Sequence, residues 1–184
     1  MPNLAPYRIE LNLRSINQLF NSMDPSPFRD KDLDPDADAF IVSWAGDFPL
    51  DAVITLRVHL EEWPAVDPVA VVRDAVRNHF ENRANLARLE FQRLMRDGRT
   101  SLIIGLVFLA ACLLGIRFVG GRQSVWAGYA AEGLTIAGWV AMWRPMQIYL
   151  YDWWPVRRRQ RHFAKLAAMH VEVVHRTPPE NRAS

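Results

Sequence analysis

The sequence is poor in cysteine, and this scarcity excludes two classes of protein. Cys112 is the only cysteine among 184 residues, so the chain can hold neither a disulfide framework nor a zinc ion bound by several thiolates. The N-terminus also lacks a basic residue followed by an apolar run, so we expect no cleaved secretory signal. Since 50% of the residues are hydrophobic, the composition suits one folded domain, or a small soluble domain with a membrane anchor.

Catalytic and cofactor motifs are missing as well. The chain has no serine elbow, Walker loop, dinucleotide fingerprint or zinc-protease motif, so we expect a protein that is not an enzyme and binds no cofactor. The five histidines lack metal-ligand spacing. Alternating aspartates from Asp30 to Asp38 resemble a calcium loop, but Pro35 or Ala37 stands where such a loop needs glycine. We therefore expect no metal site and interpret these acids as solvated side chains near a helix N-terminus; a looser divalent-cation site is the alternative. Asp34 followed by Pro35 predicts the start of that helix, and Asp67 followed by Pro68 predicts the start of a second one.

Two long apolar segments dominate the second half of the chain. Residues 100–119 carry Arg117 as their only charge, and as a helix they would span about 30 Å, the thickness of a bilayer's hydrocarbon core. Residues 125–143 carry only Glu132. We predict a transmembrane helix in each segment, with an external turn at 120–124, and hence a two-helix α transmembrane hairpin. A buried helix of a soluble protein is the alternative for each segment.

Arginines flank this predicted hairpin. They precede the first segment and follow the second, at Arg88, Arg93, Arg96, Arg99, Arg144, Arg157, Arg158, Arg159 and Arg161. The short connection holds only Arg117 and Arg122. The positive-inside rule then predicts that both termini lie in the cytoplasm and the turn at 120–124 outside. Because the charges flank apolar segments, we assign them to anionic lipid headgroups and expect no nucleic acid as a partner.

Aromatic residues gather after the second segment, in a predicted interfacial segment at residues 144–155. Tryptophan and tyrosine favour the boundary between lipid and water. Pro145 disfavours helical geometry at Arg144, so we expect a bend there and then a short helix, 146–154, along the membrane surface. The residues predicted to contact the interface or lipid are Trp143, Arg144, Trp153, Trp154, Arg157, Arg158 and Arg159.

Small residues recur four apart on both segments, which permits close contact between helix backbones in lipid. We predict that the two helices, or neighbouring copies of the chain, pack through Ala111, Gly115, Gly133, Ala137 and Ala141. Glu132 lies about seven residues into the second segment, a depth at which ionised side chains are usually paired or functional. A salt bridge with Arg117 or Arg122, an ion or proton pathway, and a contact with a partner's helix remain open for this intramembrane charge.

Patterns outside the apolar segments predict a cytoplasmic α+β domain. Alternating apolar and polar residues predict strands at 7–13, 53–61 and 170–175. A small sheet of about three strands would then join both ends of the chain. The predicted parts are an α+β segment at 1–66, a long amphipathic helix at 67–99, and a basic helix, strand and tail at 156–184. Whether the long helix continues into the membrane or breaks at Gly98 is open at this point.

Four stretches carry a resemblance to uncharacterised bacterial two-span inner-membrane proteins of similar length. They are LNLRSINQLFNSMDPSPF from Leu11, DLDPDADAFIVSWA from Asp32, GRTSLIIGLVFLAACLL from Gly98 and EGLTIAGWVAMWRPMQIYLYDWWP from Glu132. Together they extend over nearly the whole chain. The resemblance implies a two-span membrane protein, and it implies no activity, cofactor or binding residue.

These features favour an accessory or scaffolding subunit that anchors or docks a protein complex at the bacterial inner membrane. The acidic region from Asp24 to Asp51, with eight acids against Arg29 and Lys31, would offer the docking face. The expected partners are an anionic lipid bilayer and a protein or identical copies. The alternative is a homo-oligomeric channel or transporter with Glu132 or Arg144 near the pathway. A membrane enzyme acting on a lipid or quinone ranks third.

Overall fold

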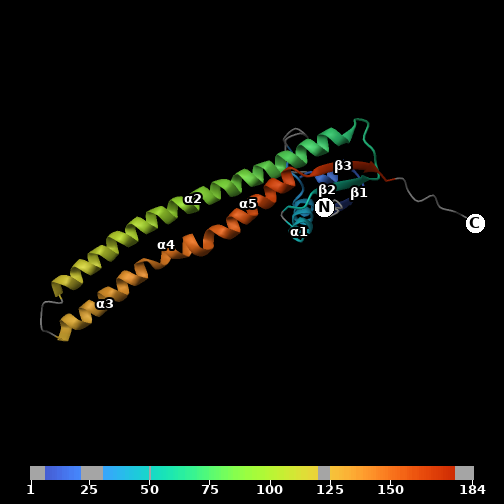
Figure 1. The fold of residues 1–184 in the computed structure, drawn as a ribbon. Coiled ribbons are helices and arrows are strands. Elements are labelled where there is room, and N and C mark those ends of the chain that lie inside the picture. Colours follow the sequence, from blue (N-terminus) through green and yellow to red (C-terminus); the bar gives the residue numbers. More distant parts are fainter. Residues whose placement is uncertain (1–6, 22–30, 50, 120–124, 177–184) are drawn as a thin grey trace, which may run out of the picture. The chain divides into compact units, whose positions relative to one another are not determined.

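The computed structural model describes residues 7–21, 31–49, 51–119 and 125–176. The chain forms two compact units (Figure 1). We call residues 1–86 together with 159–184 the sheet unit, and residues 87–158 the helical unit. The turn expected at 120–124 and the tail after Arg176 lie outside the described residues.

The sheet unit contains three parallel strands in the order β1-β2-β3. They are β1 (Tyr7–Leu13), β2 (Ile54–Leu60) and β3 (His170–His175), and they match the strands that the alternating pattern predicts. Strand β3 pairs Val171 with Leu56 of β2, so residues near the two ends of the chain share one sheet. Parallel neighbours need long crossovers, and the crossover from β2 to β3 contains the whole helical unit.

The first crossover contains α1 (Pro35–Gly46), which begins where the sequence predicts. The backbone N–H of Asp36 donates to Asp34 Oδ1 at 2.9 Å, and a proline occupies the first helical position, where a missing N–H is tolerated. A short 3-10 helix, η1 (Ile16–Leu19), precedes α1. The local sequence therefore sets the start of α1 without help from distant residues.

The sheet unit has a core closed to water. Every second side chain of β2 is at most 2% exposed: Ile54, Leu56, Val58 and Leu60. The other elements add Leu19, Phe20, Ile41, Val72, Val76, Phe80 and Leu166, also at most 2% exposed. Burying one such side chain stabilises a fold by about 1.5–3 kcal/mol, so hydrophobic burial accounts for the stability of the sheet unit in water.

Helix α2 (Pro68–Val119) is one continuous helix of 52 residues. Its start is capped, since the backbone N–H of Val69 donates to Asp67 Oδ1 at 3.1 Å. The predicted amphipathic helix and the first apolar segment are therefore one helix, with no break at Gly98.

The helical unit corrects the predicted fold class. Beyond residue 124 the chain forms α3 (Val125–Ala141), α4 (Trp143–Gln147), the π-helical turn η2 (Ile148–Asp152) and α5 (Trp153–Ala167). The two-helix α transmembrane hairpin is wrong, because among the described residues only α2 is long and apolar enough to cross a membrane. Helix α3 has 17 residues, about 26 Å, and stops short of the predicted end at residue 143.

Pro145 explains where α3 ends. Proline has no N–H, so the carbonyl of Ala141, four residues earlier, cannot have its usual helical donor. The N–H of Met142 bonds instead to the carbonyl of Trp139, three residues back, at 3.1 Å, and α4 starts at the next residue. The interruption thus lies between Ala141 and Trp143, before Arg144. The sequence analysis expected it at Arg144 itself. The single interfacial helix expected after it is replaced by α4, η2 and the start of α5.

Candidate membrane-binding and docking surfaces

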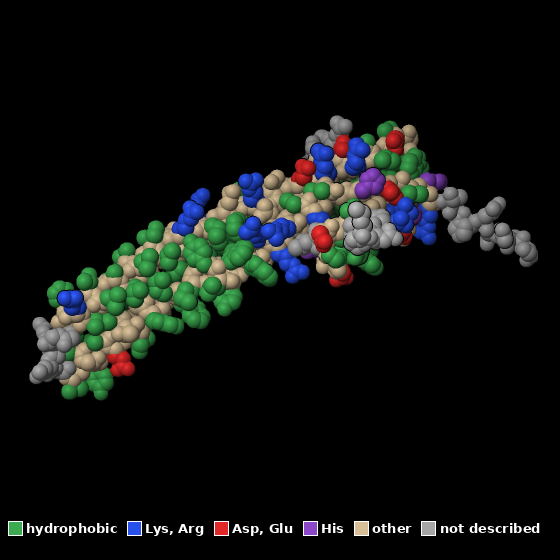
Figure 2. Space-filling view, viewed as in Figure 1, with side chains coloured by type: hydrophobic (Ala, Val, Ile, Leu, Met, Phe, Trp, Pro, Cys, Tyr) green, Lys and Arg blue, Asp and Glu red, His purple; other side chains and the backbone are tan. Residues whose placement is uncertain are grey.

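The helical unit exposes apolar side chains over most of its length. In the most apolar 18-residue window of α2 only 11% of the residues are buried. Figure 2 shows hydrophobic side chains covering the visible face of this part of α2 and of α3, with charged side chains toward its ends. Among the most exposed are Ile103, Ile104, Val107, Phe118, Val125, Trp126, Tyr129, Trp139 and Val140, at 63–81%. Large contiguous apolar surfaces mark contacts with a protein or a membrane.

Helices α2 and α3 approach closely at glycines. A Cβ added at Gly138 would lie 2.8 Å from Leu109 Cδ1, and one at Gly115 would lie 3.1 Å from Leu134 Cδ1. A Cβ at Gly105 would lie 3.0 Å from the carbonyl oxygen of Ala141. At each of these three positions a Cβ would crowd the neighbouring helix, and glycine avoids this contact.

The predicted packing residues fall at different places in this arrangement. Gly115 and Ala141 lie at the contact between α2 and α3. Ala137 is half-buried and Ala111 is exposed, and Gly133 faces open space. The sequence analysis missed Gly105 and Gly138, although for Gly105 the spacing of seven from Gly98 to Gly105 and on to Cys112 was a usable signal.

Gly98 anchors α2 to the turn η2. A Cβ at this position would lie 2.9 Å from Ile148 Cγ2 and 3.4 Å from the ring of Tyr149, and Ile148 is 0% exposed. The glycine thus admits η2 against α2 within the helical unit. Cys112, whose thiol is buried beside Gly138, fills space in the same contact region.

The charges of the helical unit are distributed unevenly. Glu132 is exposed, and no ion pair joins it to another of the described residues; Arg122 lies outside them. Arg144 instead pairs with Asp152 at 3.5 Å.

The predicted interface residues lie on or next to α4 and α5. Trp143 and Trp154 are 63% and 67% exposed. Trp153 is half-buried, with the Arg157 guanidinium 5.8 Å from the centre of its ring. Arg144, Arg158 and Arg159 are exposed. Aromatic rings and arginines therefore share one short stretch of the chain, as a membrane boundary requires.

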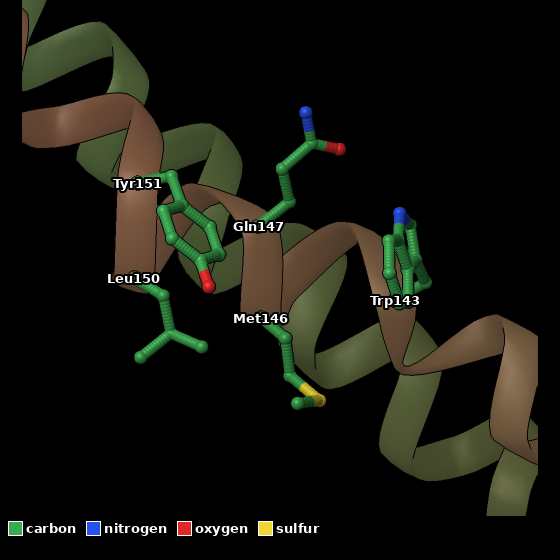
Figure 3. A pocket seen from close by; sticks show the side chains of 5 residues that line it. All are labelled: Trp143, Met146, Gln147, Leu150 and Tyr151. Carbon is green, nitrogen blue, oxygen red and sulfur yellow. The ribbon is translucent and has the colours of Figure 1, made fainter.

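Two neighbouring hollows lie beside these aromatics. The larger, of about 250 Å³, is lined by Leu109, Gly138, Trp139, Met142, Trp143 and Met146. The smaller, of about 140 Å³, is lined by Trp143, Met146, Gln147, Leu150 and Tyr151. In Figure 3 the rings of Trp143 and Tyr151 lie on opposite sides of Gln147 and Met146, and Leu150 lies beside Tyr151. The two hollows share Trp143 and Met146 and are therefore adjacent; we call them together the depression.

The sheet unit holds a charged cluster around His79 of α2. Its Nδ1 lies 3.1 Å from Asp32 Oδ1 and its Nε2 lies 3.2 Å from Asp38 Oδ1. Arg83, one turn further on, donates to the other oxygen of Asp38 and stacks on the ring of Phe163, 4.5 Å from its centre. These contacts join α1, α2 and α5. Both imidazole nitrogens take part in these contacts, so His79 has a structural role here. The described residues contain no cluster of three or more His, Cys, Asp or Glu that can hold a metal.

The outer face of α1 combines aromatic and acidic side chains. Phe40 and Trp44 are 38% and 51% exposed and lie one turn apart, with ring centres separated by 5.8 Å. Asp36 and Asp47, also exposed, lie near the two ends of the same helix. Exposed tryptophan is typical of the central residues of protein interfaces. We call these four residues the α1 face.

Two ionisable groups of the sheet unit have shifted pKa values. Hydrogen bonding from Arg57 lowers the pKa of Glu172 below 4.5; their closest nitrogen and oxygen are 2.7 Å apart. Burial lowers the pKa of Lys165, and attraction to Asp51 partly opposes this shift. Lys165 also donates to the carbonyl of Pro49. Both groups hold parts of the unit together, one across β2 and β3 and one between α5 and the loop after α1.

Comparison of the chain with known protein families, curated proteins and solved structures gives no match.

Proposed function

We propose that this chain is a membrane-anchored accessory subunit of the bacterial inner membrane, which tethers its sheet unit in the cytoplasm and docks a partner protein there. The observation that carries the proposal is the exposed apolar surface of α2 after Gly98. In water such a surface is unfavourable, by about 25 cal/mol for each square ångström. In lipid this surface faces a solvent as apolar as itself, so we assign the part of α2 after Gly98 to the hydrocarbon core.

The sheet supports a placement of both chain ends on one side of the membrane. Strands β1 and β2 precede the helical unit, β3 follows it, and β3 is hydrogen-bonded to β2. Strands of one sheet share one aqueous compartment, so the chain that enters lipid in α2 returns to the side it left. The arginines beside these elements favour the cytoplasm for that side.

The α1 face is the proposed docking surface. Its aromatic pair supplies apolar contact area with few rotatable bonds, and the surrounding acids favour a partner with basic side chains. The sequence around it is acidic, with eight acids against two bases from Asp24 to Asp51. Docking there leaves the apolar surface of the helical unit free for lipid.

Two measurements test this function. After cell disruption the chain should sediment with membranes and stay there after an alkaline carbonate wash. Affinity purification from detergent-solubilised membranes should then recover one partner protein at a fixed ratio to the chain. Trp44→Ala should abolish this recovery, whereas Trp63→Ala, at a tryptophan of similar exposure outside the α1 face, should preserve it. Recovery that survives Trp44→Ala, or a chain that stays in the supernatant, contradicts the proposal.

One observation favours a second function, a homo-oligomeric channel. Glu132 projects from an apolar helix without an ion pair to any other described residue, and carboxylates at such depths often line wet pathways. A channel requires several copies, since the described residues of one copy contain a single helix long enough to span. Native mass spectrometry distinguishes the two functions, because a ring of identical subunits supports the channel. Ion flux into vesicles that falls with Glu132→Gln supports it further.

A further inference from the structure

The depression over Met146 differs from the rest of the apolar surface of the helical unit because it is concave and joined to polar groups. Its floor and walls are apolar, from Leu109 and Gly138 to Leu150. Gln147 contributes an amide, Tyr151 a hydroxyl and Trp143 an indole N–H at the smaller hollow (Figure 3). An apolar pocket with a few polar groups toward one end is the usual form of a site for an amphipathic ligand.

The size of the depression argues against a helix of a partner protein. A helix with its side chains is about 10–12 Å across, whereas a hollow of 250 Å³ is only roughly 6 Å on a side. A single unbranched hydrocarbon chain is narrow enough to enter it. Methionine adapts well to such a ligand because its side chain is flexible and unbranched, and both Met142 and Met146 line the larger hollow.

The charge around the depression argues for an anionic headgroup. From residue 139 to residue 158 the helical unit carries Arg144, Arg157 and Arg158 against Asp152 alone. Arg144 keeps 61% of its side chain exposed while it pairs with Asp152, so its remaining N–H groups face solvent or lipid. A planar guanidinium donates two parallel hydrogen bonds to a phosphate. Aromatic rings around the depression are typical of the depth at which headgroups meet acyl chains.

We propose that the depression lined by Trp143, Met146 and Leu150 binds one anionic phospholipid, with an acyl chain in the hollow and the phosphate held by the nearby arginines. This inference rests on the proposed membrane anchoring and names a specific ligand of the same unit. The selected lipid fastens α4 and η2 to the headgroup layer. Contacts with bulk lipid elsewhere on α2 and α3 carry no such selection, because residues 100–119 hold Arg117 as their only charge and residues 125–141 hold only Glu132.

Native mass spectrometry of the full chain tests the site. The chain is taken from bilayers of equal parts phosphatidylglycerol, which is anionic, and phosphatidylcholine, which is zwitterionic. We expect one retained phosphatidylglycerol, preferred at least about fivefold over phosphatidylcholine, as arginines near an anionic surface imply. Met146→Trp fills the depression and should remove the retained lipid. Val140→Trp, at an exposed residue of α3 that lines neither hollow, should retain it.

The arginines are tested separately. Replacing Arg144, Arg157 and Arg158 by Gln should leave one lipid bound but abolish the preference for phosphatidylglycerol, while Arg117→Gln, near the other end of the apolar part of α2, should leave the preference intact. Equal retention of both lipids by the unaltered chain, or loss of lipid in Val140→Trp as well, overturns the site. Sedimentation with membranes reports the anchor alone, so a chain that sediments but selects no lipid contradicts only the lipid site. Hydrogen exchange of β2 verifies that each variant keeps its sheet unit.

Discussion

The two units of this molecule use the same apolar residue types in opposite ways. In the sheet unit, Leu56, Val58 and Phe80 are 0% exposed. In the helical unit, Val107 and Phe118 are 67% and 81% exposed. Helix α2 passes from one pattern to the other without interruption. Composition therefore says little about where a side chain points. What differs is the medium around these side chains. The core of the sheet unit excludes water, whereas the outer surface of the helical unit faces lipid in the proposed setting.

The comparison also separates two uses of small residues. In the helical unit glycines mark the points where α2 and α3 touch, as expected in the proposed lipid setting, where burial gives no hydrophobic gain for pressing apolar side chains together. The sheet unit needs no such glycines, since large side chains fill its core and water supplies the driving force. Identical substitutions should therefore have different effects in the two units.

The largest contrast is expected for phenylalanine on the same helix. Phe80→Ala should destabilise the sheet unit by about 3–5 kcal/mol, because a fully buried ring leaves a cavity. Phe108→Ala, at a residue 47% exposed, should leave the sheet unit unchanged. Hydrogen exchange of the amides of β2 in the detergent-solubilised chain measures both effects. Equal changes in exchange for the two variants would falsify the division into two differently solvated units.

A charge on the outer surface of α2 tests the other half of the comparison. Val107→Asp should weaken membrane insertion by about 2.5–3.5 kcal/mol, the penalty for aspartate near the centre of a spanning helix, and leave β2 exchange unaltered. Leu89→Asp, at a residue 49% exposed on α2 before the apolar segment, is the matched control. The measurement is the fraction of chain that remains in washed membranes. If Leu89→Asp releases the chain as readily as Val107→Asp, the lipid boundary is misplaced.

The cap of α1 gives a smaller effect that is confined to the sheet unit. Asp34→Ala should destabilise α1 by about 1 kcal/mol, because the N–H of Asp36 loses its acceptor. Asp47→Ala removes a similar charge at the C-terminal end of α1, where an acid does not stabilise the helix dipole, and should be neutral or slightly favourable. Exchange rates of the α1 amides distinguish the two, and a larger loss in Asp47→Ala contradicts the role of the cap.

The smallest effect concerns pH. Arg57 lowers the pKa of Glu172 in the folded sheet, so the unfolded chain binds more protons between that lowered pKa and the ordinary value of 4.5. The stabilisation is complete above pH 4.5 and is lost as the pH falls through the lowered pKa. Glu172→Gln should remove this part of the pH dependence, and Glu62→Gln, at an exposed acid, should keep it. Urea midpoints from pH 3 to 7 provide the measurement; unchanged pH dependence in Glu172→Gln is the contrary result.

Much of the sheet unit could be predicted from short-range patterns. Alternation located all three strands, and the Asp34 and Asp67 signals located the starts of α1 and α2. The parallel direction of β2 and β3 was not predictable, since it depends on where a crossover of more than a hundred residues returns. The charged cluster of Asp32, Asp38 and His79 was missed for a similar reason: its members lie on separate elements and show no common spacing.

The helical unit was harder because opposing local signals overlap there. The apolar segment at 125–143, with Glu132 as its only charge, favoured a second spanning helix, while Pro145 opposed it. The effect of the proline reaches back four residues, to the carbonyl of Ala141. Small-residue spacing found Gly115 and Ala141, but it also selected Gly133, which faces open space. Spacing along one helix cannot tell which side meets a neighbour when small residues occur on several sides.

The sequence alone determined the elements whose causes are local: the capped helix starts, the alternating strands and the apolar character of α2, because caps, periodicity and side-chain hydrophobicity act within a few residues. Only the tertiary structure decided which glycines meet another helix, how the strands pair, and where the hollow over Met146 forms. Those properties arise from residues brought together across long stretches of chain, and their physical basis is steric fit between elements.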